Sequence, residues 1–200
     1  MINTRAIIVF VIGVTAGAIS QSDSLTLQAA ATPETGFVSR ANYTNAFFGF
    51  SLSLPQDAPI RDFNVPSRGA GAHALFGLQS QTNGLTVLSV MAQEALRPTE
   101  AKELVSRDSA HIRKLHIAGK EFWRSESQEK TKAGKLRSTN YATALNGYVL
   151  QFMLVSFDPK LADELEHDIE SITFFDPAKA KEVAGPDSRP YIVAKPAVGK

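Results

Sequence analysis

The clearest pattern of hydrophobic and polar positions lies between residues 135 and 157, where two strand-like runs flank a tight-turn sequence. The runs Lys135–Leu145 and Tyr148–Phe157 are rich in the β-branched, aromatic and alternating residues that suit a pleated strand. Asn146-Gly147 lies between them, and both residues can adopt the positive φ that a type I′ turn requires. Both faces of the second run are mostly apolar, so we expect it to form a strand in the middle of a sheet that is covered on both sides.

The segment that follows, Pro159–Ser171, has the periodicity of an amphipathic helix. Asp158-Pro159 supplies a side-chain acceptor at the N-cap and a fixed φ at the first helical position. The apolar residues recur at spacings of four, four and three, which puts them on one stripe: Leu161, Leu165, Ile169 and Ile172. We expect this stripe to lie on the sheet.

Similar patterns predict the other elements. Each strand or hairpin follows from alternation or from an Asn-Gly turn, and the helix from apolar residues at helical spacing. A strand is predicted at Phe47–Pro55, followed by a loop at Gln56–Ala70. A hairpin is predicted from Ala72–Gln81 and Leu85–Ala92 around Thr82-Asn83-Gly84. A helix is predicted to begin at Pro98, with the apolar positions Ala101, Leu104, Val105, Ile112 and Leu115, and a strand is predicted at Ile117–Lys130.

The first eighteen residues, Met1–Ala18, have the pattern of a secretory signal peptide. Arg5 precedes a short apolar run, and Ala16-Gly17-Ala18 is the small-x-small sequence that a signal peptidase recognises. A second cleavage point is Ala29-Ala30-Ala31, so the mature chain begins after Ala18 or after Ala31. We expect a secreted or periplasmic protein. The chain has no cysteine, which excludes disulfides and the lipid-modified cysteine of a bacterial lipoprotein.

Charge and hydropathy limit the partners of the mature chain. The sequence holds 21 Lys and Arg against 20 Asp and Glu, and Met1–Ala18 contributes one Arg and no acid, so the mature chain is formally neutral. A neutral chain has no global field that would attract nucleic acid, and we predict no nucleic-acid partner. No later stretch approaches the roughly 20 apolar residues of a spanning helix, so we predict no transmembrane segment.

Both ends of the mature chain lack apolar periodicity. Residues 19–41 are expected to be a flexible lead-in, and residues 178–200 a disordered tail with several prolines. Between them lies one predicted α+β domain, residues 42–177. On this basis a fragment of about that range should keep the cooperative unfolding of the full domain.

Two stretches resemble the PsbP-like family. Residues 43–55, Tyr-Thr-Asn-Ala-Phe-Phe-Gly-Phe-Ser-Leu-Ser-Leu-Pro, resemble the opening of PsbP-like domains. The Asn146-Gly147-Tyr148 turn and the helix that ends Ile-Glu-Ser-Ile-Thr-Phe174 are similar to the closing half of those domains. The resemblance implies a central antiparallel β-sheet sandwiched by helices, that is, an α/β/α sandwich, and a protein that binds protein partners without catalysis.

The sequence offers one candidate enzymatic constellation. It contains no nucleophile elbow, no phosphate-binding loop and no His-Glu-x-x-His motif. His111 and His116 are five residues apart and could converge with Glu121 on a metal if the chain turns there. Their loose spacing and their basic neighbours favour solvated side chains instead. We therefore predict no catalytic residue, no metal and no cofactor.

Six residues are candidates for a partner-binding surface. Arg61, Phe63 and Arg68 lie in the proline-containing loop, and long loops on rigid scaffolds often carry binding residues. Arg124, Glu126 and Arg137 lie on the predicted strands, where they could form a charged platform. Because acids and bases are interleaved there, cross-strand ion pairing is the alternative interpretation.

Taken together, these patterns favour a secreted, non-enzymatic binding or accessory protein that acts through a protein partner. Two alternatives remain: a small metal-dependent hydrolase that uses the histidines, and a carrier that holds an apolar ligand between sheet and helix. Native mass spectrometry would separate the three, since a protein, a metal and a lipid add different masses.

The first prediction concerns export. N-terminal sequencing of the protein from its natural host should give Ile19 or, with cleavage at the second point, a residue near Thr32 as the first residue. Recovery of an intact Met1 on a cytoplasmic protein would contradict it.

Overall fold

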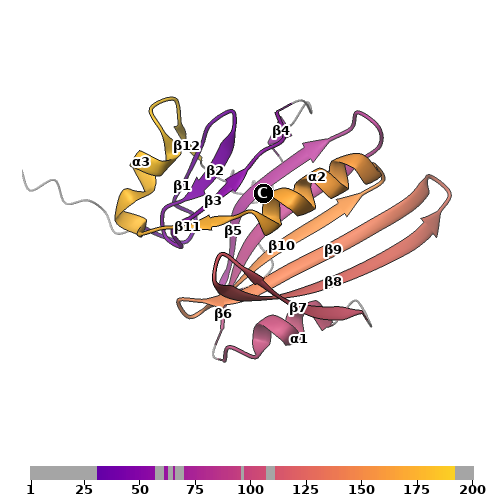
Figure 1. Cartoon of the computed structure of the whole chain (residues 1–200), viewed down its shortest axis with the longest axis horizontal. Coiled ribbons are helices and arrows are strands. Elements are labelled where there is room, and N and C mark those ends of the chain that lie inside the picture. Colours follow the sequence, from indigo (N-terminus) through magenta and orange to yellow (C-terminus); the bar gives the residue numbers. More distant parts are fainter. Residues whose placement is uncertain are drawn as a thin grey trace, which may run out of the picture. The chain divides into compact units, whose positions relative to one another are not determined.

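The described part of the chain forms two antiparallel sheets and three short helices (Figure 1). The computed structural model describes residues 31–56, 61–62, 65, 70–95, 97–106 and 111–191. The predicted signal peptide, the candidates Phe63 and Arg68, and residues 192–200 lie outside them. No helix in the described part of the chain reaches the length and apolar character that a membrane crossing requires.

The larger sheet has seven strands in the order β4-β5-β6-β10-β9-β8-β7. Its strands are β4 (Arg61–Asp62), β5 (Ala72–Ser80), β6 (Thr86–Glu94), β7 (Ile112–Ile117), β8 (Lys120–Thr131), β9 (Gly134–Leu145) and β10 (Tyr148–Ser156). The smaller sheet has five strands in the order β11-β3-β2-β1-β12. Its strands are β1 (Gly36–Val38), β2 (Asn42–Asn45), β3 (Phe50–Ser53), β11 (Thr173–Phe174) and β12 (Arg189–Tyr191).

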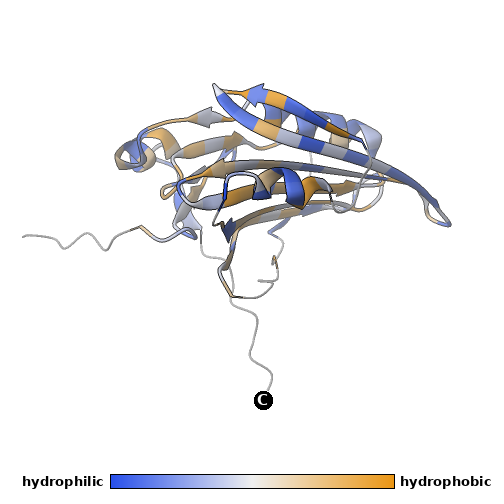
Figure 2. Ribbon diagram, turned by 90° about the horizontal axis from the view of Figure 1, so that it is seen from below, coloured by the Kyte–Doolittle hydropathy of each residue, from blue (hydrophilic) through white to orange (hydrophobic). Residues whose placement is uncertain are grey.

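The predicted Asn-Gly hairpins are confirmed. Asn146 and Gly147 have φ of 52° and 81°, and Leu145 pairs with Tyr148 on either side of them. Gly84, with φ of 118°, lies in the loop that joins β5 to β6. Figure 2 shows the alternation of hydrophilic and hydrophobic residues along strands of this kind. The strands are thus positioned by local turn chemistry and by the period of two.

The helix predicted from Pro98 through Leu115 is wrong beyond its first turns. Helix α1 spans Glu100–Ser106, and Ile112–Ile117 form strand β7. Leu115 lies opposite Phe122 of β8, while Ile112 packs on the other face with the residues around α1. A spacing of three places two residues on one face of a helix but on opposite faces of a strand, and the hairpin that β7 forms with β8 gives it a complete ladder.

The main core lies between the two sheets and helix α2 (Pro159–Glu170). Tyr43 of β2 stacks on Phe76 of β5 with ring centroids 4.4 Å apart, and Phe50 of β3 meets Phe152 of β10 edge to face. The apolar stripe predicted for α2 packs into the same core. Asp158 caps this helix by accepting hydrogen bonds from the backbone N–H groups of Lys160 and Leu161.

The opposite face of the larger sheet is covered only in part, which differs from the predicted sandwich by helices. Helix α1 has seven residues and packs Ala101 and Val105 on Ala142 and Val149. Beyond it this face is open, and Val155 of β10 is 36% exposed. The α+β class and the antiparallel sheet are as predicted. The face of the larger sheet that holds the main core, however, is covered by α2 together with the smaller sheet. The opposite face is covered by the short helix α1 alone.

Both predicted unstructured ends contain ordered elements. Strand β1 lies within the expected lead-in, and the expected tail holds the end of the short 3₁₀ turn Pro177–Lys179, helix α3 (Ala180–Ala184) and β12. Strand β1 pairs with both β2 and β12. The side chain of Tyr191 is buried against Tyr43 and Phe76, and its hydroxyl accepts a hydrogen bond from the N–H of Gly77. Elements this short show no period in the sequence and are stabilised by tertiary contacts.

Accordingly, a fragment of residues 42–177 should unfold at lower temperature than the full domain. It lacks β1 and β12, and with them Tyr191. The single substitution Tyr191→Ala should itself lower the free energy of unfolding by about 3 kcal/mol, since it removes a buried aromatic ring. Val183→Ala on the exposed side of α3 is the control and should change it by less than about 0.5 kcal/mol. Thermal denaturation measures both, and equal melting of fragment and full domain would contradict the docking of these ends.

Candidate functional site

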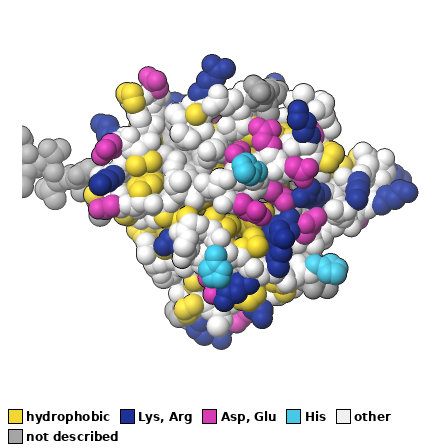
Figure 3. Space-filling view, viewed as in Figure 1, with side chains coloured by type: hydrophobic (Ala, Val, Ile, Leu, Met, Phe, Trp, Pro, Cys, Tyr) yellow, Lys and Arg dark blue, Asp and Glu magenta, His cyan; other side chains and the backbone are white. Residues whose placement is uncertain are grey.

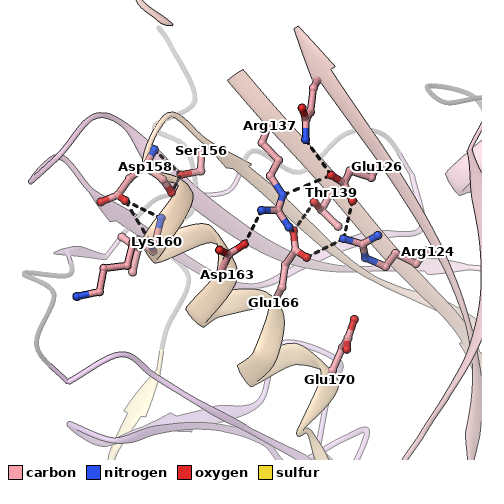
Figure 4. A network of polar contacts seen from close by, with 12 residues as sticks. Arg124, Glu126, Arg137, Thr139, Ser156, Asp158, Lys160, Asp163, Glu166 and Glu170 are labelled. Carbon is pink, nitrogen blue, oxygen red and sulfur yellow. Dashed lines mark hydrogen bonds and ion pairs between the residues drawn. The ribbon is translucent and has the colours of Figure 1, made fainter. Parts of the chain in front are cut away.

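Arg124 of β8 lies at the centre of a polar cluster beneath helix α2 (Figure 4). Its side chain is 7% exposed, and its Nη2 donates to Glu126 Oε2 at 2.9 Å and to Glu166 Oε2 at 2.7 Å. Its Nε donates to the hydroxyl of Tyr141 at 3.0 Å. The register of β8 and β9 brings these side chains together, because Tyr141 on β9 lies directly opposite Arg124 and Thr139 lies opposite Glu126.

Helix α2 closes the cluster with the carboxylate of Glu166. Its Oε1 accepts hydrogen bonds from the Thr139 hydroxyl at 2.7 Å and lies 2.7 Å from Nη2 of Arg137. One carboxylate, 10% exposed, thus accepts hydrogen bonds from Arg124 and Thr139 and forms an ion pair with Arg137. Asp163, one turn earlier on the helix, accepts from Arg137 Nη1 at 2.6 Å.

The surroundings fix the ionisation of these groups. Burial alone would raise the pKa of Glu126, but hydrogen bonds from Arg124 and Gln128 outweigh it and the pKa falls below its usual 4.5. Because its folded-state pKa is depressed, Glu126 stabilises the fold above its unfolded pKa, and this contribution is lost as the pH falls through the folded value. Burial opposes the charge of Arg124, yet Tyr141 and Glu166 raise its pKa, and burial raises the pKa of Tyr141.

A hollow of about 650 Å³ opens beside this cluster. It is lined by His111, Ile112, Arg113, Arg124, Glu126, Ser127 and Gln128. Nη2 of Arg113, one of the lining residues, lies 3.8 Å from Glu170 Oε1, and the same oxygen accepts a hydrogen bond from the Tyr141 hydroxyl at 2.9 Å. Charges of both signs are interleaved over this side of the molecule (Figure 3). The cluster thus satisfies its own charges.

Three of the six predicted surface residues meet here and the others do not. Arg124, Glu126 and Arg137 belong to the cluster, but Arg124 is buried under α2 and all three contact carboxylates or guanidinium groups of the chain itself. Arg61 lies exposed on β4 at the other edge of the sheet. Phe63 and Arg68 lie outside the described residues. A role of these residues in binding a partner stays a prediction.

The sequence analysis did not identify Glu166, which joins both arginines. The signal was present, since Asp163, Glu166 and Glu170 recur at spacings of three and four and form an acidic stripe beside the apolar one. The matching basic residues, Arg124 and Arg137, lie on neighbouring strands. Only the docking of α2 over the long β8–β9 hairpin brings the two sets together.

The histidine constellation does not converge in the described part of the chain. His116 and Glu121 lie opposite each other on β7 and β8, but the Glu121 carboxylate is 2.5 Å from Nζ of Lys114. No three histidine, aspartate or glutamate side chains within the described ranges come close enough to hold a metal ion.

A second hollow, of about 590 Å³, lies on the other face of the larger sheet, between α1 and strands β6 and β10. Its apolar lining includes Met91, Leu104, Val149 and Met153. Its polar lining comprises Gln93, Glu94, Arg97, Glu100, Glu103 and Gln151. We call it the α1 groove. It continues onto the open part of the sheet, where Val155 pairs across to Val87.

Comparisons with known proteins find a likeness of fold. No model of a protein family matches the chain, and no curated protein matches it. Similar solved structures include the solution structure of cyanobacterial PsbP (CyanoP) from Synechocystis sp. PCC 6803, with 10% identity, a TM-score of 0.49, and 74% of this chain and 96% of that chain covered.

Two further structures are similar. A protein from Bacteroides thetaiotaomicron VPI-5482 has 18% identity and a TM-score of 0.45 over 72% of this chain; the chain spans about half of that protein, 49% of its length. LpqN, described as involved in cell envelope biogenesis of Mycobacterium tuberculosis, has 12% identity and a TM-score of 0.41 over 62% of this chain and 83% of its own.

The substitution Glu166→Gln should lower the free energy of unfolding by about 3 kcal/mol, because it leaves two guanidinium groups facing each other without the buried carboxylate between them. Asp163→Asn is the matched control on the same helix: its carboxylate is 70% exposed, and the loss should be below about 1 kcal/mol. Urea denaturation of both variants gives the comparison. Equal, small losses would mean that Glu166 does not hold α2 on the hairpin.

Proposed function

We propose that this protein is a secreted, non-enzymatic binding or accessory protein and that it binds a protein partner through the open face of its larger sheet. The observation that supports this proposal most is that α1 covers only part of one face of strands β6 and β10. Val87 and Met91 of β6 and Met153 and Val155 of β10 share the face that α1 leaves open. The first three are half-buried and Val155 is exposed.

This surface has the character of a docking site. Contiguous apolar surface on a sheet face is costly to leave in water, and large exposed patches commonly mark interaction sites. Methionine side chains adapt their shape to a partner and recur on binding surfaces. The interspersed polar residues Gln151 and Asn140, both half-buried, can donate and accept hydrogen bonds within such an interface.

The polar cluster under α2 supports a role without catalysis. Its carboxylates and guanidinium groups neutralise one another, and both the depressed pKa of Glu126 and the raised pKa of Tyr141 keep these groups away from proton exchange near neutral pH. Secretion is supported by the signal-like pattern of Met1–Ala18.

The α1 groove also gives the carrier hypothesis a definite location, because its methionines and Leu104 could contact an apolar ligand. A retained lipid in native mass spectrometry of the protein from its host would favour the carrier. A protein partner without a lipid would favour the proposal.

Site-specific photo-crosslinking in the natural host tests the proposal. A photoreactive residue placed at Val155, on the open face, should crosslink to one partner, and Met153→Arg in the same chain should abolish the crosslink because it introduces a charge into the apolar surface. The matched position is Glu164, on the exposed side of α2, where no crosslink is expected. A crosslink from Glu164 alone would place the interface on the α2 side of the molecule and contradict the proposal. The absence of a crosslink from both positions would contradict protein binding.

A further inference from the structure

We infer that the α1 groove binds a partner segment that presents a large apolar side chain beside a lysine or arginine. This inference rests on the proposed function and names the chemistry of the partner. It follows from two properties of the groove that are independent of each other, namely the apolar character of its floor and the charge of its rim.

The floor is built from both sides. Val149 is buried under α1, and Leu104 of the helix packs in the same small cluster. Met91 and Met153 continue this floor away from the helix and are only half-buried. A partner side chain of the size of leucine or methionine laid on them would complete the packing that α1 begins, and burying such a side chain contributes roughly 1.5–3 kcal/mol.

The rim carries an excess of negative charge. Among the described residues that line the groove, three carry carboxylates, Glu94, Glu100 and Glu103, and one carries a guanidinium, Arg97. Arg97 lies 3.6 Å from Glu100 and 3.4 Å from Glu103, and its side chain is 66% exposed, so these pairs are weak. Within the described part of the chain, Glu94 takes part in no ion pair.

This imbalance is local. The chain as a whole carries a formal net charge of +1, and the cluster under α2 pairs its acids with its bases. Negative charge gathered around an apolar floor favours an occupant with the opposite sign next to its apolar anchor. A lysine or arginine of the occupant can reach the rim while its aliphatic stem lies on the methionines.

Model peptides test the inference on the mature chain that N-terminal sequencing defines. The probe is a short fluorescent peptide of leucine and lysine arranged as an amphipathic helix. Its two counterparts replace every lysine by glutamate or every leucine by serine. Fluorescence anisotropy should show that the leucine–lysine peptide binds at least about tenfold more tightly than either counterpart, and that its affinity falls as salt is added.

Substitutions locate the binding. The double change Glu94→Gln and Glu103→Gln should remove most of the preference for lysine over glutamate, since it neutralises two rim carboxylates without changing their size. Met153→Gln should weaken the leucine-containing peptides about tenfold or more. Val183→Gln, at an exposed apolar residue of α3, is the matched control and should change nothing. Thermal melting of each variant verifies that it is folded.

Equal binding of the lysine and glutamate peptides, or of the leucine and serine peptides, would overturn the inference. So would binding that is unchanged by the rim and floor substitutions. The proposed function is tested separately: if the partner crosslinked at Val155 binds the Glu94→Gln, Glu103→Gln variant as tightly as the wild type, the groove inference fails and the proposed function stands. If no protein crosslinks at Val155, the proposed function fails.

Discussion

Strand β10 is apolar on both faces, and the rest of the structure depends on how those two faces are covered. One face presents Leu150, Phe152 and Leu154, all buried beneath helix α2 and the smaller sheet. The other presents Val149, Met153 and Val155, of which only Val149 is buried by α1. At roughly 25 cal/mol per Å² of apolar surface, the covered face supplies the burial that stabilises the fold. The partly covered face retains surface that a partner can still bury.

The buried charges beneath α2 act on geometry more than on net stability. Removing two guanidinium groups and a carboxylate from water costs several kcal/mol for each ion, which their mutual attraction only offsets. Their geometric demand is stricter than that of the apolar stripe, because Glu166 must meet Arg124, Arg137 and Thr139 at once. A helix held by leucines alone could slide along the sheet. We interpret this cluster as the feature that sets the position of α2 over the β8–β9 hairpin.

The sequence predicted the elements whose cause is local. The hairpin at Asn146-Gly147 follows from two residues that tolerate positive φ, and α2 follows from its cap and its apolar stripe. The smaller sheet was missed in part because β1 and β12 have three residues each, too few to show a period, and because β12 pairs with a strand from the other end of the domain. Gly36 illustrates this: a Cβ there would come within 2.8 Å of the Tyr43 ring, a constraint that becomes visible only when the two strands are paired.

The same distinction explains what was predicted of the candidate site. Arg124, Glu126 and Arg137 could be grouped from strand periodicity alone, because residues two apart share a face. Whether they face water or a helix depends on where α2 docks, and that depends on long-range packing. Their burial with Glu166 leaves few of their hydrogen-bonding groups for a partner. Among the described residues of the α1 groove, the acidic rim has only the exposed Arg97 as a partner of opposite charge, and it adjoins apolar surface that the fold leaves open. This contrast is the reason for proposing recognition on the α1 face and a structural role for the charges beneath α2.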